Sequence, residues 1–281
     1  MDDRNTTSFD WQGHRGARGL FPENSIPSFL KALEFPEIKT LELDLVVSKD
    51  NKLVISHEPW ISHHICSYPH PNYNLVKEAE EDSLIIYQMD YEKVKSFDCG
   101  SFGNSRFPDQ HKMTTYKPLL SELVDNVMSY CKAQDKALPY FNIELKSQEE
   151  WYGKKIPEPD EFVRLVLSEL KKLKIEEKSI LQSFDLKVLE ALKKQTNIPI
   201  SYLTEKAENH QKQLKKISFI PDYYSPYYIH VTKNMIEDMH EKNIKVVCWT
   251  VNKTAEMKTL KRMGVDGIIT DYPNKIPKLE E

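Results

Sequence analysis

The feature that most constrains the fold is the alternation, from residue 135 onward, of short β-branched runs with longer stretches of helical periodicity. Such alternation is typical of βα units built around a parallel sheet. In the longer stretches apolar residues recur at helical spacing, as at Phe162, Val166 and Leu170. Six strands are expected in this part of the chain, at residues 139–145, 179–183, 199–203, 221–225, 245–251 and 267–270.

The first part of the chain adds two strands, at residues 11–13 and 40–45, joined by a helix with an apolar face at Ile26, Phe29 and Leu33. Eight βα units predict an α/β fold of the TIM (β/α)8 barrel class, for which about 250 residues is typical. The chain has 281 residues and contains no repeat or linker that would indicate a second domain. We therefore expect a single barrel domain over residues 1–281.

One segment does not follow the βα pattern. Residues 52–56 would make a ninth strand, and the polar turn before them indicates a hairpin-like excursion over residues 46–57. Residues 57–117 are rich in His, Tyr, Pro and Ser, and helical periodicity resumes only at Leu119. We expect an insertion at residues 46–117, between strand 2 and helix 2 at the barrel mouth, where long loops often serve as lids or binding elements.

Charge and hydropathy exclude several classes of partner. The formal net charge is −4 and no basic block is present, so we expect no nucleic-acid partner. No run approaches the ~18 apolar residues that span a bilayer, so no integral membrane segment is expected. The amino-terminal segment is acidic and has no apolar core, which predicts a cytoplasmic protein from the chain as given; removal of a signal peptide would instead indicate a periplasmic or secreted one. The oligomeric state stays open.

The four cysteines are Cys66, Cys99, Cys131 and Cys248, and no two of them form a CxxC pair. This spacing predicts neither a zinc ribbon nor a thioredoxin-like site. We expect no disulfide framework, and thiols that suit a reducing compartment.

Candidate site residues lie at the predicted carboxyl ends of strands, where the active sites of TIM barrels are built. The two-residue period of a strand places Glu42 and Asp44 on one face, and Glu144 and Lys146 likewise. Three carboxylates inside a barrel are costly unless they are paired or bind metal, which favours an oxygen site for a hard cation, Ca²⁺ or Mg²⁺. A structural ion-pair network with Lys146 and Arg15 is the alternative.

Two histidines flank these carboxylates in the predicted topology: His14 follows the first strand and His57 the hairpin excursion. Such a pair can divide the general acid and base roles at a phosphoryl group, whose oxygens Arg15 and Lys146 can bind. A glycosidase acid and base pair is a further use of carboxylates at a barrel mouth, but the histidines and cations favour a phosphorylated substrate. An unfilled carboxylate cluster would raise the histidine pKa values.

Aromatic residues gather near the predicted sixth and seventh strands. Trp249 is the residue that we expect to contact substrate, because it precedes a polar strand end facing the mouth. Together with nearby tyrosines it could form a cage for a quaternary ammonium group, although ordinary packing is the commoner role of such rings. The tyrosines are Tyr223, Tyr224, Tyr227 and Tyr228.

Five segments, HRGARGLFPENSIPSFLKAL, LELDLVVSKDNKLVISHE, NIELK, CWTVN and GVDGIITDYP, make the chain similar to the glycerophosphodiester phosphodiesterase family of phospholipase-C-like TIM barrels. The resemblance runs from residue 11 to 277. It implies general acid and base roles for His14 and His57. It also implies that one divalent cation, Ca²⁺ or Mg²⁺, is bound by Glu42, Asp44 and Glu144. Phosphate binding is implied for Arg15 and Lys146.

The activity that this resemblance implies is metal-dependent hydrolysis of a small-molecule glycerophosphodiester to sn-glycerol 3-phosphate and an alcohol. The alternatives are a lysophospholipase-D-like enzyme, which would need an apolar channel, and a catalytically inactive glycerophosphodiester-binding protein, which would be expected to lose a metal carboxylate or a catalytic histidine. Two departures from the family stand in the insertion. Glu58 replaces the usual Asp after the second histidine, and the Arg-Thr-Thr and Gly-rich segment common in the family after that histidine is missing. Separately, His63, His64 and His70 favour a polar lid over a metal site.

Overall fold

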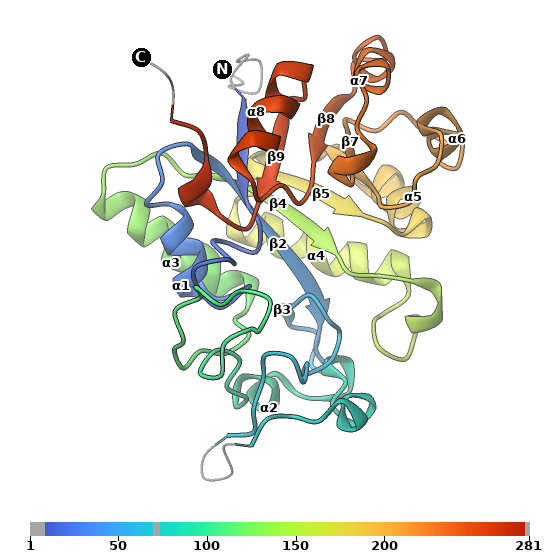
Figure 1. The fold of residues 1–281 in the computed structure, drawn as a ribbon. Helices are drawn as coiled ribbons and strands as arrows, with labels where there is room; N and C mark the ends of the chain where they lie inside the picture. The colour runs from blue at the N-terminus through green and yellow to red at the C-terminus, as the bar shows by residue number, and fades with distance from the viewer. Residues whose placement is uncertain (1–8, 70–73, 279–281) are drawn as a thin grey trace.

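The computed structural model describes residues 9–69 and 74–278, in which eight parallel strands close into a barrel (Figure 1). The strands follow one another around the barrel in chain order, and β9 pairs with β1 to close it. This arrangement confirms the predicted TIM barrel. The barrel strands are β1 (Asp10–Gly13), β2 (Ile38–Val47), β4 (Tyr140–Leu145), β5 (Ser179–Ser183), β6 (Ile200–Thr204), β7 (Tyr223–Pro226), β8 (Lys245–Cys248) and β9 (Gly267–Thr270).

Helices surround the barrel and cover the outer faces of its strands (Figure 1). The first helix begins where the Ser25 side chain accepts a hydrogen bond from the Ser28 N–H, and the last one ends at Gly264 in the left-handed conformation. The helices are α1 (Ile26–Ala32), α3 (Leu120–Ala133), α4 (Pro159–Leu173), α5 (Leu186–Gln195), α6 (His210–Leu214), α7 (Lys233–His240) and α8 (Thr254–Met263), with the 3₁₀ turns η4 (Glu149–Trp151), η5 (Glu176–Lys178), η6 (Tyr228–His230) and η7 (Pro273–Lys275).

The strand β2 shows how the sequence sets the two faces of the barrel wall. Leu41, Leu43 and Leu45 are fully buried in the cluster that packs the helices onto the sheet. The alternating residues Glu42 and Asp44 are also buried but belong to the barrel interior. Fully burying each leucine contributes about 1.5–3 kcal/mol, which stabilises a wall whose inner face carries charge.

One strand is shorter than predicted. The run at residues 245–251 forms β8 only as far as Cys248, and Trp249 makes an isolated bridge with Tyr227 beyond it. Apolar character continues to Val251, which is buried, so the sequence pattern extends past the point where ladder hydrogen bonding stops.

The insertion lies between β2 and α3, beyond the carboxyl end of β2 (Figure 1). It begins with the predicted hairpin, in which β3 (Leu53–Ile55) pairs antiparallel with the end of β2. The rest of the segment contains η2 (Glu78–Ser83), η3 (Ile86–Gln88) and α2 (Tyr91–Lys95). These short elements enclose a hydrophobic cluster of their own, which includes Ile61, Ile86 and Phe97.

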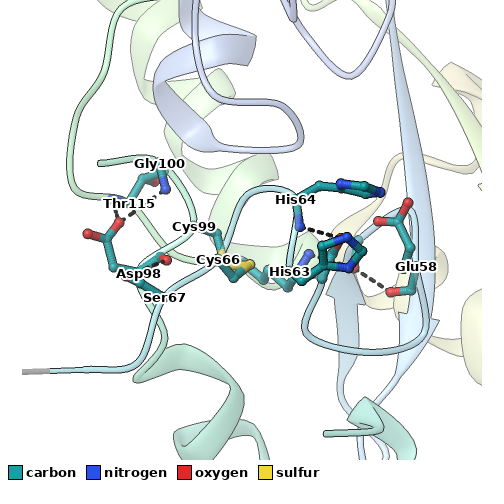
Figure 2. The surroundings of a disulfide bond; sticks show 12 residues. Glu58, His63, His64, Cys66, Ser67, Asp98, Cys99, Gly100 and Thr115 are labelled. Carbon is teal, nitrogen blue, oxygen red and sulfur yellow. Dashed lines mark hydrogen bonds between the residues drawn. A yellow bond between two sulfur atoms is a disulfide. The ribbon is translucent and has the colours of Figure 1, made fainter. Parts of the chain in front are cut away.

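The cysteines differ from the sequence expectation. Cys66 and Cys99 form a disulfide inside the insertion (Figure 2). Beside it, the Ser67 N–H donates to the Asp98 carbonyl at 2.7 Å, so backbone pairing and the covalent link hold the same two segments together. Cys131 and Cys248 are free and buried.

Within residues 9–69 and 74–278, none of the helices combines the length and apolar character needed to cross a membrane.

Candidate active site

A cavity of about 740 Å³ opens at the carboxyl ends of the barrel strands, and seven of the eight residues selected from the sequence line it. Asp44 is the exception; it lies directly behind the lining, in contact with Arg15 and Lys146. The seven lining residues are His14, Arg15, Glu42, His57, Glu144, Lys146 and Trp249.

Three carboxylates converge at the floor of this cavity. Glu42 and Asp44 come from β2, and Glu144 lies opposite Asp44 in the register of β4. One ligand oxygen from each lies within 4.8 Å of the others, and all three residues are buried. This cluster is the group that the sequence predicted as a hard-cation site.

The charges around the three carboxylates test whether they fit a cation. No Lys or Arg side chain in the described chain pairs with Glu42, which accepts only the Arg15 backbone N–H and the Gln182 amide, each at 3.0 Å. Burial, followed by the charges of Asp44 and Glu144, raises the pKa of Glu42 well above its usual value. The Asp44 Oδ1 atom is buried without a hydrogen-bond partner. Uncompensated negative charge and a free oxygen both fit a bound divalent cation.

The ion pairs expected from the alternative, a structural network of the carboxylates with Arg15 and Lys146, are present as well. Arg15 Nε lies 3.1 Å from Asp44 Oδ2, and Lys146 Nζ lies 2.7 Å from Glu144 Oε1. Burial alone would raise the pKa of Asp44, but Arg15, His57, Lys146 and the Asn24 hydrogen bond together outweigh burial and keep that pKa below its usual value. Burial raises the pKa of Glu144 to about 7 in spite of Lys146. The network therefore compensates Asp44 but leaves Glu42 and Glu144 under-neutralised.

The His14 ring is oriented by the barrel closure. Its backbone N–H donates to the Thr270 carbonyl at 2.9 Å, and its Nδ1 lies 2.6 Å from Asp271 Oδ1. Burial acts to raise the pKa of Asp271, but His14, Arg18 and the Asn252 hydrogen bond together keep that pKa below its usual value. Asp271 is therefore ionised and accepts a hydrogen bond, and Nδ1 carries the proton. The other ring nitrogen, Nε2, is 3.9 Å from Glu42 Oε2 and faces the carboxylates.

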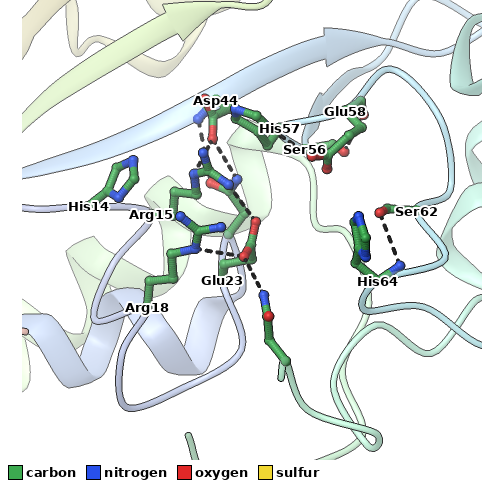
Figure 3. Close-up of polar contacts among 12 residues, drawn as sticks. His14, Arg15, Arg18, Glu23, Asp44, Ser56, His57, Glu58, Ser62 and His64 are labelled. Carbon is green, nitrogen blue, oxygen red and sulfur yellow. Dashed lines mark hydrogen bonds and ion pairs between the residues drawn. The ribbon is translucent and has the colours of Figure 1, made fainter. Parts of the chain in front are cut away.

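The second histidine follows the hairpin strand β3 and shares the same site (Figure 3). His57 Nδ1 lies 2.8 Å from Glu58 Oε1. The Ser56 hydroxyl donates to the Glu58 carbonyl, and the buried Lys117 ammonium donates to that hydroxyl at 2.8 Å. The glutamate that departs from the family pattern therefore makes the contact that orients the ring.

The histidine pKa values move opposite to the sequence expectation, which was wrong on this point. Burial, followed by the positive charges of Arg15 and Lys146, lowers the pKa of His57 to about 4. Burial also lowers the pKa of His14, although Asp271 opposes it. Asp271, Asp44 and Glu58 act to raise these pKa values, but desolvation of the rings and the nearby Arg and Lys charges outweigh them.

Four residues of the site were not assigned a role from the sequence, namely Arg18, Gln182, Asn252 and Asp271. Arg18 lines the cavity and shares Glu23 with Arg15, so that one carboxylate holds both guanidinium groups (Figure 3). Gln182 donates to Glu42, and Asn252 donates to Asp271 at 2.7 Å. The signal was available for two of them, because Asn252 and Asp271 follow predicted strands at the carboxyl end.

The first loop is held in place by the segment after it. The Asn24 amide donates to Asp44 Oδ2 at 2.8 Å. Gly16 has a φ of +84°, and a Cβ there would lie 2.5 Å from the Ser28 backbone carbon. Only glycine allows the loop to pass so close to α1.

Of the aromatic residues near the sixth and seventh strands, Trp249 faces the cavity of the site and the tyrosines lie around or away from it. Trp249 lines the cavity, donates from Nε1 to the Ser225 carbonyl at 2.9 Å, and contacts Tyr227 at a centroid distance of 5.4 Å. Tyr224 is buried in the barrel core, and Tyr223 lines a separate cavity. Tyr228 packs on Tyr227 rather than on Trp249.

The histidines of the insertion belong to its own polar contacts. His63 Nδ1 lies 2.7 Å from Glu81 Oε1. Its ring lies next to that of His64, tilted by 42° (Figure 2). Neither joins a group of three metal-ligand side chains within residues 9–69 and 74–278. His70 lies outside the described residues.

A family model decides between the classes of enzyme that this geometry admits. The model of the glycerophosphoryl diester phosphodiesterase family matches residues 14–275. The chain belongs to this family. It is a phosphoric diester hydrolase by membership, in agreement with the resemblance of its sequence motifs.

Relatives and solved structures agree over nearly the whole chain. Proteins named glycerophosphodiester phosphodiesterase from Caldanaerobacter subterraneus and Bacillus altitudinis are each 26% identical. Both align over 95% of this chain, and over 95% and 96% of their own length, respectively. The structure of a Silicibacter pomeroyi protein, 27% identical, has a TM-score of 0.81 and covers 95% of this chain and 91% of its own. A phosphodiesterase from Oleispira antarctica, solved with the product sn-glycerol-3-phosphate, shares the fold with a TM-score of 0.72 at 21% identity, over 95% of this chain and 94% of its own.

Proposed function

We propose that the protein hydrolyses glycerophosphodiesters to sn-glycerol 3-phosphate and an alcohol, with one divalent cation, Ca²⁺ or Mg²⁺, and with His14 and His57 as the proton-transfer pair. The observation that carries this proposal is a single cavity that brings three buried carboxylates within 4.8 Å and flanks them with two oriented histidines. The sn-glycerol-3-phosphate bound to the Oleispira antarctica enzyme supports the choice of product.

In this proposal Glu42, Asp44 and Glu144 hold the cation. A bound cation supplies positive charge that offsets the charge developing on the phosphoryl oxygens. Arg15 and Lys146 lie beside the same carboxylates and present further positive charge to those oxygens. Both side chains line the cavity, so a phosphodiester can reach them without rearrangement of the barrel.

Each histidine presents one ring nitrogen for catalysis, because Asp271 and Glu58 occupy Nδ1 of His14 and His57. One Nε2 accepts the proton of the attacking hydroxyl, and the other donates a proton to the leaving alcohol. The lowered pKa values keep a ring neutral and ready to act as a base. The bound phosphodiester is an anion, and it favours protonation of the ring that acts as the acid.

The direct test is a substrate panel. The purified full chain is incubated with glycerophosphocholine, glycerophosphoethanolamine or glycerophosphoglycerol in Ca²⁺ and in Mg²⁺, and both products are quantified. We expect equimolar sn-glycerol 3-phosphate and free alcohol. Failure to cleave any of the three in either metal would refute the proposal, and choline release from lysophosphatidylcholine at a matching rate would favour the lysophospholipase-D-like alternative.

A further inference from the structure

The cavity mouth is divided by charge. β1 and β6 lie four strands apart in either direction around the barrel, so their carboxyl ends stand on opposite sides of the mouth. Arg15 and Arg18 follow β1. Acidic residues line the cavity after the three consecutive strands β4, β5 and β6, which lie two, three and four strands from β1, namely Glu149, Glu150, Asp185 and Glu205.

Two of the four acidic side chains are already paired. Glu149 accepts from the Lys187 ammonium at 2.7 Å, and Asp185 accepts hydrogen bonds from Ser147 and Tyr152. Glu150 and Glu205 are exposed, and neither has an ion-pair or hydrogen-bond partner among residues 9–69 and 74–278.

Positive charge is scarce on that side. Among the described lining residues, Lys146 and Lys206 are the cations at these strand ends, and Lys146 pairs with Glu144 at 2.7 Å, which leaves Lys206 beside the four carboxylates. The ends of β4, β5 and β6 therefore carry net negative charge that faces the cavity, while Arg15 and Arg18 stand after β1.

Aromatic rings lie on the same side as the acidic residues. Trp151, Phe184 and Trp249 all line the cavity, and the rings of Phe184 and Trp249 meet edge to face at a centroid distance of 5.5 Å. Phe184 is 36% exposed despite its apolar side chain. Lys146 Nζ lies 5.8 Å from the Phe184 centroid, so Phe184 marks the border between the phosphate side and the acidic side. Aromatic faces attract cations, and ammonium groups in particular.

We propose that this acidic and aromatic side of the mouth, with Glu150 and Glu205 as its free charges, selects phosphodiesters whose alcohol carries an ammonium group, as choline and ethanolamine do. The inference rests on the proposed phosphodiesterase function. With the phosphoryl group between the histidines and Arg15, the leaving alcohol extends toward the opposite strands. There an ammonium meets carboxylates and ring faces, whereas a neutral glycerol headgroup gains neither interaction.

The test compares kcat/KM for glycerophosphocholine, glycerophosphoethanolamine and glycerophosphoglycerol in the same metal at low salt. The test variant is E150Q/E205Q. The matched control is E176Q/E177Q, which removes two exposed charges from η5, at the amino end of β5 and away from the mouth. Retained turnover of glycerophosphoglycerol shows that each variant is folded.

We expect the wild-type enzyme to prefer both ammonium substrates, and the test variant to lose between about two- and thirtyfold of that preference, the range for two exposed charge interactions. The control keeps the full preference, and raised salt weakens it in the wild type. A wild type without the preference, or a test variant equal to the control, overturns the inference while leaving the proposed function intact. Absence of cleavage for every diester would overturn both.

Discussion

At the scale of single residues, the site depends on partners that set the protonation and direction of each reacting group. Asp271 and Glu58 each bind one ring nitrogen of a histidine, and Glu23 holds two arginines side by side. Glu42 differs from these because its contacts are uncharged donors. The site thus contains two oriented histidines and a carboxylate that needs a cation. Substitutions of the histidines and of the carboxylates should therefore have different effects on activity.

Replacing a metal carboxylate should weaken activity in a way that metal restores. In E42Q, D44N or E144Q the side chain keeps its shape but loses charge, so turnover falls and recovers in part at high Ca²⁺ or Mg²⁺. In H14A or H57A, kcat should fall by on the order of 10²–10⁴ without such recovery, the effect of a lost general acid or base. Steady-state kinetics across a metal titration distinguish these outcomes, and equal recovery of both groups would contradict the assigned roles.

The lowered pKa of His57 predicts an unusual acidic limb. The ring that acts as the base must be neutral, and His57 in that role, with a pKa of about 4, stays neutral as the pH falls well below the ordinary 6.5. At saturating metal, kcat/KM should therefore show no loss on acidification from pH 7 to about pH 5, and a decline toward pH 7 would instead report the partner His14, whose pKa is also lowered.

At limiting metal the same profile should fall earlier. The pKa of Glu144 is raised to about 7 by burial, so protons compete with the cation as the pH drops below that value. The measurement is kcat/KM against pH at two metal concentrations. Loss of half of the activity as the pH is lowered through 6.5, at saturating metal, would contradict a neutral, desolvated His57.

At the scale of elements, the insertion is a packed unit rather than a loose lid. Its short elements enclose their own apolar cluster, and the Cys66–Cys99 disulfide links two of its segments. Gln110 donates to the carbonyls of Arg18 and Phe21, and these hydrogen bonds join the insertion to the loop that follows β1. The stability of this unit therefore bears on the position of His57.

The disulfide provides the test at this scale. It closes a sequence separation of 33 residues, and its loss should lower the free energy of unfolding by about 3–4 kcal/mol. Thermal unfolding of the wild type should shift down in reductant, while C66A/C99A should be insensitive to it. Denatured, non-reduced protein should show two free thiols, those of Cys131 and Cys248. Four free thiols would contradict the link.

Regular elements and the place of the insertion were predictable, but the contacts inside the insertion were not, for a physical reason. Strands such as 179–183 and 267–270 matched the structure because burial imposes a periodic pattern on the sequence. Cys66 and Cys99 lie in irregular backbone, where no period indicates which distant residues meet. Glu42 and Asp44 were found because the strand period fixes their shared face.

At the scale of the whole molecule, closure of the barrel builds the site. His14 and Asp271 are 257 positions apart, and they meet because β9 pairs with β1 and completes the circle. The same circle brings Glu144 on β4 beside Asp44 on β2. It also places Arg15 and Arg18 after β1 across the mouth from Glu205 after β6. A rigid barrel wall thus sets the distances among groups contributed by distant parts of the chain.

The most direct test of this account is metal add-back to chelator-stripped enzyme, with glycerophosphodiester turnover as the readout and E42Q as the matched variant. We predict that the stripped wild-type enzyme is inactive, that Ca²⁺ or Mg²⁺ restores it along a saturable curve, and that E42Q needs a higher metal concentration for half-restoration. Full turnover after exhaustive chelation, or identical metal curves for the two proteins, would contradict the assignment of the three carboxylates as the metal site that serves the reaction.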